Sequence, residues 1–266
     1  MAGAAEFTGE VPAFYDRCLG PVLFEPYAAD LVGRLPSRSS LRVLELACGT
    51  GVVTRRLREA LPDSATLVAT DLNEPMLAYA RAAVPAPGIS WQAADAQALP
   101  FPDSSFDVVV CQFGFMFLPD KRRGFREARR VLAPGGLLLA NVWCSLDQNP
   151  AVGAIQAVLE RLFPDDPPRF LETPYGYHDS ARLRSDLAGA GWADVQLEQV
   201  RLTSRGPSAR EFATGFVRGS PLTHSLIERA ADLDAITHEL TQALIPTGGE
   251  SPFQPTLAAT VITATR

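Results

Sequence analysis

Apolar residues follow a regular alternation between residues 41 and 143. Short runs of branched apolar side chains predict strands buried on both faces, and the longer amphipathic segments between them predict helices. Alternating strands and helices of this length predict right-handed crossovers and a parallel sheet. The predicted strands are Leu41–Ala47, Thr66–Thr70, Ile89–Ala94, Asp107–Gln112 and Leu137–Trp143, and the predicted helices are Val52–Leu61, Glu74–Ala83 and Asp120–Leu132.

The flanking segments follow a looser pattern. Before residue 41 we predict helices at Val11–Leu19 and Glu25–Leu35, with Pro21 and Pro36 as breakers. For residues 164–177 we predict a loop. The later helices lie between predicted strands, so we expect them to form a cap on the sheet. These helices are Pro150–Phe163, Ser180–Ala190, Ser208–Val217 and Thr223–Leu244, and the strands are Val195–Leu202 and Thr256–Thr265.

Composition narrows the class of protein. The chain has 266 residues, 47% hydrophobic and 20% charged, with a net charge of −6. That length supports a sizeable core, and the negative charge argues against a nucleic-acid partner. The four cysteines have no metal or redox spacing. The start lacks the pattern of a secretory signal, and no apolar run is long enough to span a membrane, so we expect a cytoplasmic protein.

A glycine loop is the strongest local signal. The strand ending near Glu45 runs into Gly49-Thr50-Gly51, and an amphipathic helix follows. Glycines there let a ligand approach the backbone at the carboxyl end of a strand. Asp71 ends the next strand, where a carboxylate can accept both hydroxyls of a ribose. The pattern therefore predicts a nucleoside site.

Two readings of that nucleoside remain open from the residues. A nicotinamide cofactor and a reductase would fit the glycine loop and Asp71, but Thr54 stands where the dinucleotide fingerprint has its third glycine. Glu45, Asp71 and Asp95 fall near the carboxyl ends of successive strands. Three carboxylates suit a ligand with a sulfonium and an ammonium better than a pyrophosphate.

At these residues the sequence resembles the class I S-adenosylmethionine-dependent methyltransferases, in the small-molecule branch typified by ubiquinone and menaquinone biosynthesis. The resemblance covers residues 41–143. The matching segments, in order, are Glu45–Gly51, Ala69–Leu77, Gln92–Phe101, Phe106–Gln112 and Arg129–Gly136.

The resemblance implies a fold and a domain plan. The fold is α/β: a Rossmann-like, doubly wound, seven-stranded and mostly parallel sheet whose last strand is antiparallel, with a helical cap. We expect a single methyltransferase domain over residues 1–266. Its parts are N-terminal helices in 1–40, a cofactor-binding core in 41–144, cap insertions around the sixth strand in 145–252, and the last strand in 253–266.

The resemblance also implies cofactor contacts. The backbone of Gly49, Thr50 and Gly51 would hold the methionine part, with Glu45 near its ammonium, and Asp71 would hold the ribose. The remaining implied contacts are Leu72 and Met76 on the adenine, Asp95 and Ala96 at its polar edge, and Gln112 and Phe113 beside the transferable methyl. No metal is implied.

Methyl transfer from a sulfonium is an in-line displacement that depends mainly on alignment. A catalytic triad is therefore not required, and none is present. His178, in an aromatic loop, is the candidate base, and Asp179 beside it could instead cap a helix. We expect a small, hydrophobic and planar acceptor under the cap, with Tyr15 and His178 as its polar contacts. A nicotinamide-dependent reductase and a cofactor-binding accessory protein without turnover are the alternatives.

Overall fold

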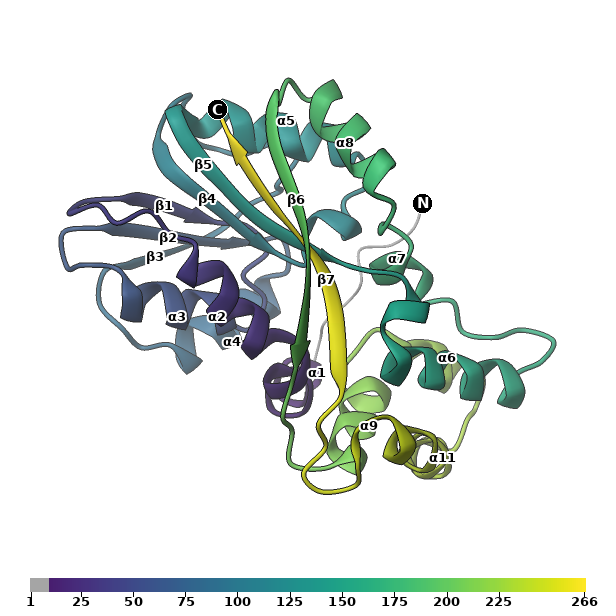
Figure 1. Cartoon of the computed structure of the whole chain (residues 1–266). Helices are drawn as coiled ribbons and strands as arrows, with labels where there is room; N and C mark the ends of the chain where they lie inside the picture. The colour runs from purple at the N-terminus through teal and green to yellow at the C-terminus, as the bar shows by residue number, and fades with distance from the viewer. Residues whose placement is uncertain (1–9) are drawn as a thin grey trace.

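Seven strands form one sheet in the computed structural model, which describes residues 10–266 (Figure 1). The sheet order is β3-β2-β1-β4-β5-β7-β6; β1 to β5 pair in parallel, and β7 is antiparallel to both β5 and β6. The strands are β1 (Arg42–Glu45), β2 (Thr66–Asp71), β3 (Ile89–Ala93), β4 (Phe106–Gln112), β5 (Leu132–Trp143), β6 (Asp194–Thr203) and β7 (Thr256–Thr265). The predicted fold class is confirmed.

Helices cover both faces of the sheet. Figure 1 shows α2, α3 and α4 on one face and α5 and α8 on the other. These are α2 (Glu25–Gly33), α3 (Val52–Ala60), α4 (Glu74–Ala83), α5 (Lys121–Val131) and α8 (Ser180–Gly189); the short helices Phe115–Phe117 and Leu146–Gln148 follow β4 and β5. No helix within residues 10–266 is long and apolar enough to cross a bilayer.

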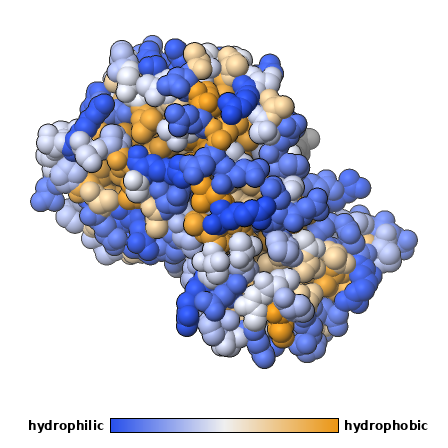
Figure 2. Space-filling view, in the orientation of Figure 1, coloured by the Kyte–Doolittle hydropathy of each residue, from blue (hydrophilic) through white to orange (hydrophobic). Residues whose placement is uncertain are grey.

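The remaining helices form a cap beyond the ends of β6 and β7. Its members are α6 (Pro150–Leu162), α7 (Glu172–Tyr175), α9 (Ala209–Arg218), α10 (Leu222–Glu228) and α11 (Leu233–Gly248). The space-filling view shows the cap as a second lobe whose surface mixes hydrophilic and hydrophobic areas (Figure 2). The first helices, α1 (Val11–Phe14) and a π-helix over Tyr15–Phe24, pack against α9.

Two helix predictions need correction. The predicted helix Thr223–Leu244 is two helices, because Ala230 adopts a left-handed φ of 50° and the Asp232 carboxylate then caps α11. The predicted break at Pro21 is also absent. Pro21 lies inside the π-helix Tyr15–Phe24. The wider π turn relieves the clash between a proline ring and the carbonyl four residues earlier, which breaks an α-helix.

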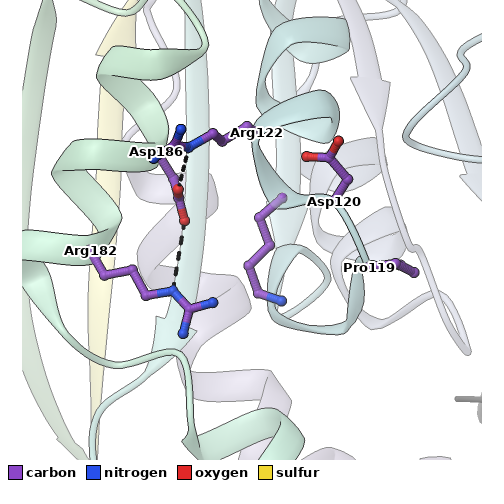
Figure 3. Close-up of a pocket in the computed structure, with 6 residues that line it drawn as sticks. Pro119, Asp120, Arg122, Arg182 and Asp186 are labelled. Carbon is purple, nitrogen blue, oxygen red and sulfur yellow. Dashed lines mark hydrogen bonds and ion pairs between the residues drawn. The ribbon is translucent and has the colours of Figure 1, made fainter.

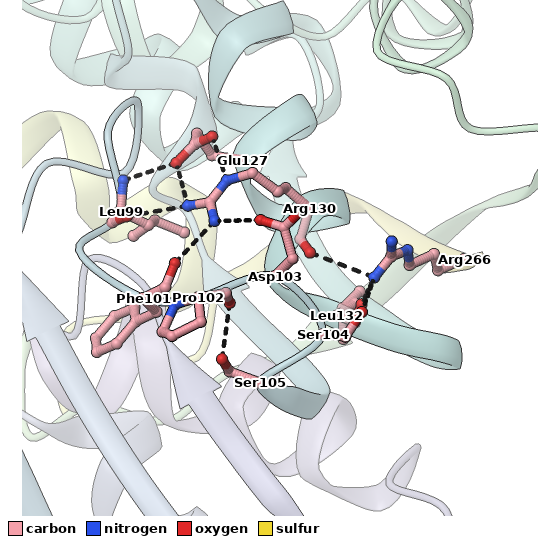
Figure 4. A network of polar contacts seen from close by, with 10 residues as sticks. All are labelled: Leu99, Phe101, Pro102, Asp103, Ser104, Ser105, Glu127, Arg130, Leu132 and Arg266. Atoms are coloured by element: carbon pink, nitrogen blue, oxygen red, sulfur yellow. Dashed lines mark hydrogen bonds and ion pairs between the residues drawn. The ribbon is translucent and has the colours of Figure 1, made fainter.

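Arg130 of α5 fixes the chain between β3 and β4 (Figure 4). Its guanidinium donates to the carbonyls of Leu99 and Phe101 and to the carboxylate of Asp103, at 2.8–3.0 Å. Glu127, which pairs with Arg130, also accepts the Leu99 N–H at 2.8 Å. These contacts hold the loop that follows Asp95 against α5, so the helix on one face positions a segment at the edge of the sheet.

Asn149 joins β5, β7 and the start of the cap. Its buried amide donates to the carbonyls of Cys144, Ser145 and Ala258, and its carbonyl oxygen accepts the Ala258 N–H at 2.9 Å. One side chain therefore satisfies four backbone groups where the sheet meets α6.

We expect Asn149→Ala to lower the free energy of unfolding by about 2–4 kcal/mol, because it leaves buried backbone groups without partners. Urea unfolding followed by circular dichroism measures this change. Gln148→Ala, at a more exposed amide one residue earlier, is the matched control and should stay within about 0.5 kcal/mol of the parent. Equal stability of both variants would show that Asn149 does not hold the junction.

Candidate active site

The glycine loop leaves room for a ligand where it leaves β1. Gly49 has a left-handed φ of +56°, and a Cβ added there would meet no atom within 4 Å. Gly51 has a φ of +87°, and a Cβ there would approach Val84 and Ala80 of the α4 end at 3.0–3.2 Å. Gly49 therefore leaves its backbone accessible, whereas Gly51 allows close packing of the loop against the neighbouring helix.

Glu45 is a buried acid at the carboxyl end of β1. Its Oε2 accepts a 2.6 Å hydrogen bond from the hydroxyl of Thr54. Burial, and then the charge of Asp71, raise the pKa of Glu45 to about 8, while the Thr54 bond partly offsets the rise. Thr54 occupies the position of the third glycine in dinucleotide-binding loops, and here its hydroxyl orients the acid.

Asp71 lies at the end of β2, beside the glycine loop. Its two carboxylate oxygens accept the N–H groups of Gly49 and Asn73, each at 2.8 Å. Burial raises the pKa of Asp71, and these N–H groups oppose the rise. Each oxygen retains a lone pair for a further donor, such as a ribose hydroxyl.

The residues expected around an adenine lie on both sides of that carboxylate. Leu72 is 59% exposed, which is unusual for a leucine, and Met76 is buried in α4. Asp95 is half-buried, and its Oδ1 accepts the backbone N–H of Gln97 at 2.8 Å; Ala96 is half-buried beside it. An exposed leucine beside a buried acid provides an apolar face for a ring.

The far side of the site is closed by the N-terminal π-helix. Tyr15 and Phe24 line a small cavity together with Glu45, Thr50 and Gln112, and its volume is about 40 Å³. The side-chain amide of Gln112, at the end of β4, donates to the Phe24 carbonyl at 3.1 Å. Burial and the charges of Asp71 and Asp16 raise the pKa of Tyr15.

Two buried oxygens in this cavity lack partners. Thr50 Oγ1 and Gln112 Oε1 accept or donate no hydrogen bond within the described residues. Buried polar atoms without partners are uncommon and mark places where a ligand or water binds. With the accessible Gly49 backbone and two acids, they match the polar groups of S-adenosylmethionine, so the residues fit that cofactor. The 40 Å³ cavity is smaller than the several hundred cubic ångströms typical of a ligand site.

An aromatic cluster extends from this cavity toward the cap. Phe113 stacks on Trp143 with ring centroids 3.8 Å apart, and Tyr27 meets both rings edge-on at 5.3–5.5 Å. Tyr175 stacks on the other side of Trp143 at 5.8 Å. Phe113 holds a strained left-handed φ of 51°, which places its ring at the end of β4.

The expected polar contacts of an acceptor lie in different places. Tyr15 lines the cavity, whereas His178 is exposed, with its Nδ1 2.7 Å from the Tyr175 carbonyl. The Asp179 carboxylate caps α8 by accepting the Ala181 N–H, the alternative role considered above.

Sequence reasoning missed two residues of the aromatic cluster's far end. Trp143 was not assigned to the site, although it ends β5, and strand ends on the same edge meet. Tyr175 is likewise not among the predicted contacts of an acceptor. Its hydroxyl is buried without a hydrogen-bond partner within the described residues. Only the packed structure shows that feature.

Comparison with known proteins bears on the core of the chain. Residues 44–140 match a family model described as a methyltransferase domain. A ubiquinone/menaquinone biosynthesis C-methyltransferase from a Shewanella strain is 39% identical over 107 residues, which are 39% of this chain and 43% of that protein. A demethylmenaquinone methyltransferase of Thermus thermophilus is 46% identical over 100 residues, 37% of this chain and 45% of that protein.

The fold comparison reaches further along the chain. A solved structure from Bacillus halodurans, described as a putative methyltransferase, aligns with a TM-score of 0.58 at 20% identity, covering 90% of this chain and 97% of that one. This likeness concerns the fold alone. The chain matches less than half the length of the curated relatives named above.

Because the pKa of Glu45 is raised in the folded protein, we expect the free energy of unfolding to depend on pH. An unfolded glutamate ionises near pH 4.5, whereas the folded one stays protonated up to about pH 8. Between these values the unfolded state binds fewer protons, so the free energy of unfolding falls as pH rises. We therefore expect Glu45→Gln, which keeps an acceptor for Thr54 and removes the ionisation, to stabilise the ligand-free protein.

The expected gain is about 3 kcal/mol at pH 7 and about 4 kcal/mol at pH 8, and it should shrink toward zero near pH 4.5. Urea unfolding of both proteins at pH 5, 6, 7 and 8 measures it. Glu59→Gln, at an exposed carboxylate of α3, is the control and should show no such trend. A constant difference between Glu45→Gln and parent across this range would contradict the assignment.

Proposed function

We propose, from the premise that residues 44–140 form a class I S-adenosylmethionine-dependent methyltransferase domain, that the protein transfers the methyl group of this cofactor to a small organic acceptor. The observation that carries the proposal is that Glu45 and the open Gly49 backbone line one cavity, while Asp71 accepts the Gly49 N–H beside it. Two acids beside an accessible loop favour a ligand with a ribose and positive groups over a pyrophosphate.

The proposed arrangement assigns each residue a contact. Glu45 faces the ammonium, Asp71 accepts the ribose hydroxyls, and Leu72 covers the adenine. Thr50 Oγ1 and Gln112 Oε1 gain the hydrogen bonds that they lack in the described residues. When bound, the cofactor supplies a methyl group on a sulfonium, which is an electrophile with a neutral leaving group.

The chain's own contribution to catalysis is alignment and exclusion of water. Phe113, strained at the end of β4, lies 6.2 Å from the ring of Phe24, which lines the cavity, and Trp143 packs against Phe113. A rigid aromatic wall can hold a nucleophile in line with the methyl group, and such positioning supplies about 7–11 kcal/mol in favourable cases. No histidine lines the cavity among the described residues, so the proposal uses no histidine base.

The acceptor is proposed to be hydrophobic and planar, because the region between the cavity and the cap is built of aromatic side chains that pack on one another: Tyr27, Phe113, Trp143 and Tyr175. Tyr15 and the Tyr175 hydroxyl are its polar contacts. The small cavity requires that the π-helix bearing Tyr15 and Phe24 move before the cofactor enters. Glu25, which follows it, pairs with Arg55 and Arg56 of α3 at 2.9–3.1 Å and so anchors the segment's far end.

Calorimetric titration tests the cofactor, with S-adenosylmethionine and nicotinamide nucleotides compared at equal concentrations. We expect saturable binding of the former alone. Transfer of labelled methyl to phenols, indoles, quinone precursors and fatty acids then tests the acceptor, with duplex DNA, transfer RNA and protein lysate as alternatives. Binding without any product would favour the accessory role, and labelling confined to a macromolecule would exclude the small acceptor.

Asp71→Ala should weaken cofactor binding at least about tenfold, because charged hydrogen bonds contribute about 1.5–3 kcal/mol each. Titration calorimetry measures the affinity, and thermal unfolding checks that the variant is folded. Glu74→Ala removes an exposed carboxylate three residues later and should bind as the parent does. Unchanged affinity in a folded Asp71→Ala protein would mean that the ribose lies elsewhere.

Tyr175→Phe separates an acceptor contact from a structural role. The Tyr175 hydroxyl is buried without a partner within the described residues, so its removal should stabilise the ligand-free protein by about 1 kcal/mol. In methyl-transfer assays the same variant should raise the KM for a hydroxylated acceptor about fivefold or more. Tyr177→Phe, which removes a 2.8 Å bond to buried Asp186, should instead lower stability. A stable variant with unchanged acceptor KM would remove Tyr175 from the site.

A further inference from the structure

A second pocket lies outside the proposed active site, between the first turns of α5 and α8. Its volume is about 210 Å³, and it is lined by Pro119, Asp120, Lys121, Arg122, Arg182 and Asp186 (Figure 3). Three of these side chains are cations and two are carboxylates. None of these residues lines the cavity at the glycine loop.

Both carboxylates of the pocket are already engaged. Asp120 caps α5 by accepting the backbone N–H of Arg123 at 3.0 Å. Asp186 accepts Arg122 Nε at 2.7 Å and the Tyr177 hydroxyl at 2.8 Å, and Arg182 Nε is 4.0 Å away. One buried carboxylate is therefore shared by two guanidinium groups and a phenol.

Lys121 is the cation of the pocket that makes no ion pair within the described residues. It is half-buried, and its Nζ donates to the Leu118 carbonyl at 2.9 Å. No carboxylate of the described residues lies within ion-pair distance of it. Its Nζ is 4.9 Å from the centroid of the Tyr177 ring, and the Arg182 guanidinium is 5.3 Å from the same centroid. The terminal nitrogens of Arg182 make no hydrogen bond within those residues.

We propose that this pocket binds a small oxyanion, the carboxylate or phosphate group of a ligand, held between Lys121 and Arg182. Two cations beside one aromatic ring repel each other, and an anion between them would offset that repulsion. A guanidinium fork and an ammonium together provide the donors that such a group needs. The pocket's formal charge of +1 favours an anion, although the whole chain carries −6.

The direction in which the pKa of Lys121 is shifted supports an anion between Lys121 and Arg182. Burial, and then the charge of Arg182, lower the pKa of Lys121, and the charge of Asp186 partly offsets the fall. An anion between the two cations would reverse the second effect and raise that pKa. The proposal does not depend on methyl transfer, and it can stand or fall separately.

The sequence offers a direct probe, because Lys121 is its one lysine. Reductive methylation with ¹³C-formaldehyde keeps the positive charge and labels this side chain and the terminal amine. Inorganic phosphate and acetate are then titrated in separate arms, with chloride keeping the ionic strength constant, and the dimethyl-lysine signal is followed by NMR. We expect a saturable shift of that signal in at least one arm.

Variants on α8 provide the contrast. Arg182→Gln should weaken the binding at least about fivefold, because it removes one of two charged donors. Arg184→Gln, at an exposed arginine two residues later that contacts only the Val195 carbonyl, should leave it unchanged. In unmodified protein, phosphate or acetate should raise the melting temperature above the chloride control, and this rise should be lost in Lys121→Met.

The two arms identify the chemistry of the ligand. Saturation by phosphate alone supports a phosphoryl group, and saturation by acetate supports a carboxylate. Linear shifts with both anions, or equal affinity in the parent and Arg182→Gln, would overturn the proposal.

Discussion

Parallel pairing of β1 with its two neighbours is the constraint on which the site depends. Glu45 pairs in register with Ala69 on one side and Val110 on the other, so β1, β2 and β4 end at the same edge. Asp71 and Gln112 lie two residues beyond those partners and therefore reach the space in front of the glycine loop. No loop conformation has to bring these groups together, because the backbone ladder already does so.

The groups at that edge are costly to the folded protein. Glu45 and Asp71 are buried acids with raised pKa values, Phe113 and Ala47 hold left-handed backbone, and several buried oxygens have no partner within the described residues. The sheet and its helices offset these costs through an apolar core that includes the centres of β4 and β5. Such local costs concentrate where proteins bind ligands. These buried acids, strained residues and unpartnered oxygens agree with a cofactor-binding site at this edge of the sheet, where a bound cofactor would offset the buried charge and supply the missing hydrogen bonds.

Sequence patterns predicted the sheet well because buried parallel strands leave a distinct apolar signature. Three consecutive valines predict a buried strand, and they form the middle of β4: Val108, Val109 and Val110. The break at Ala230 was missed because a left-handed alanine has no sequence signal comparable to glycine. The sequence motifs were sufficient to predict the candidate cofactor-binding residues at the strand ends. The contacts assigned to these residues stay predictions. The stacking of Trp143 on Phe113 was not predictable from motifs, since the register of β4 against β5 that brings them together is set by pairing between segments thirty residues apart.

The position of β7 has a consequence for synthesis on the ribosome. Residues 256–265 insert between β5 and β6 and pair with both along their lengths. Until they leave the exit tunnel, β5 and β6 cannot reach each other, and each presents an unpaired backbone edge after the cap helices have already emerged. From the synthesis of β6, which ends at Thr203, until β7 emerges, the nascent chain therefore carries two open strand edges. Protection by a chaperone at that stage should matter more for this topology than for a sheet completed in chain order.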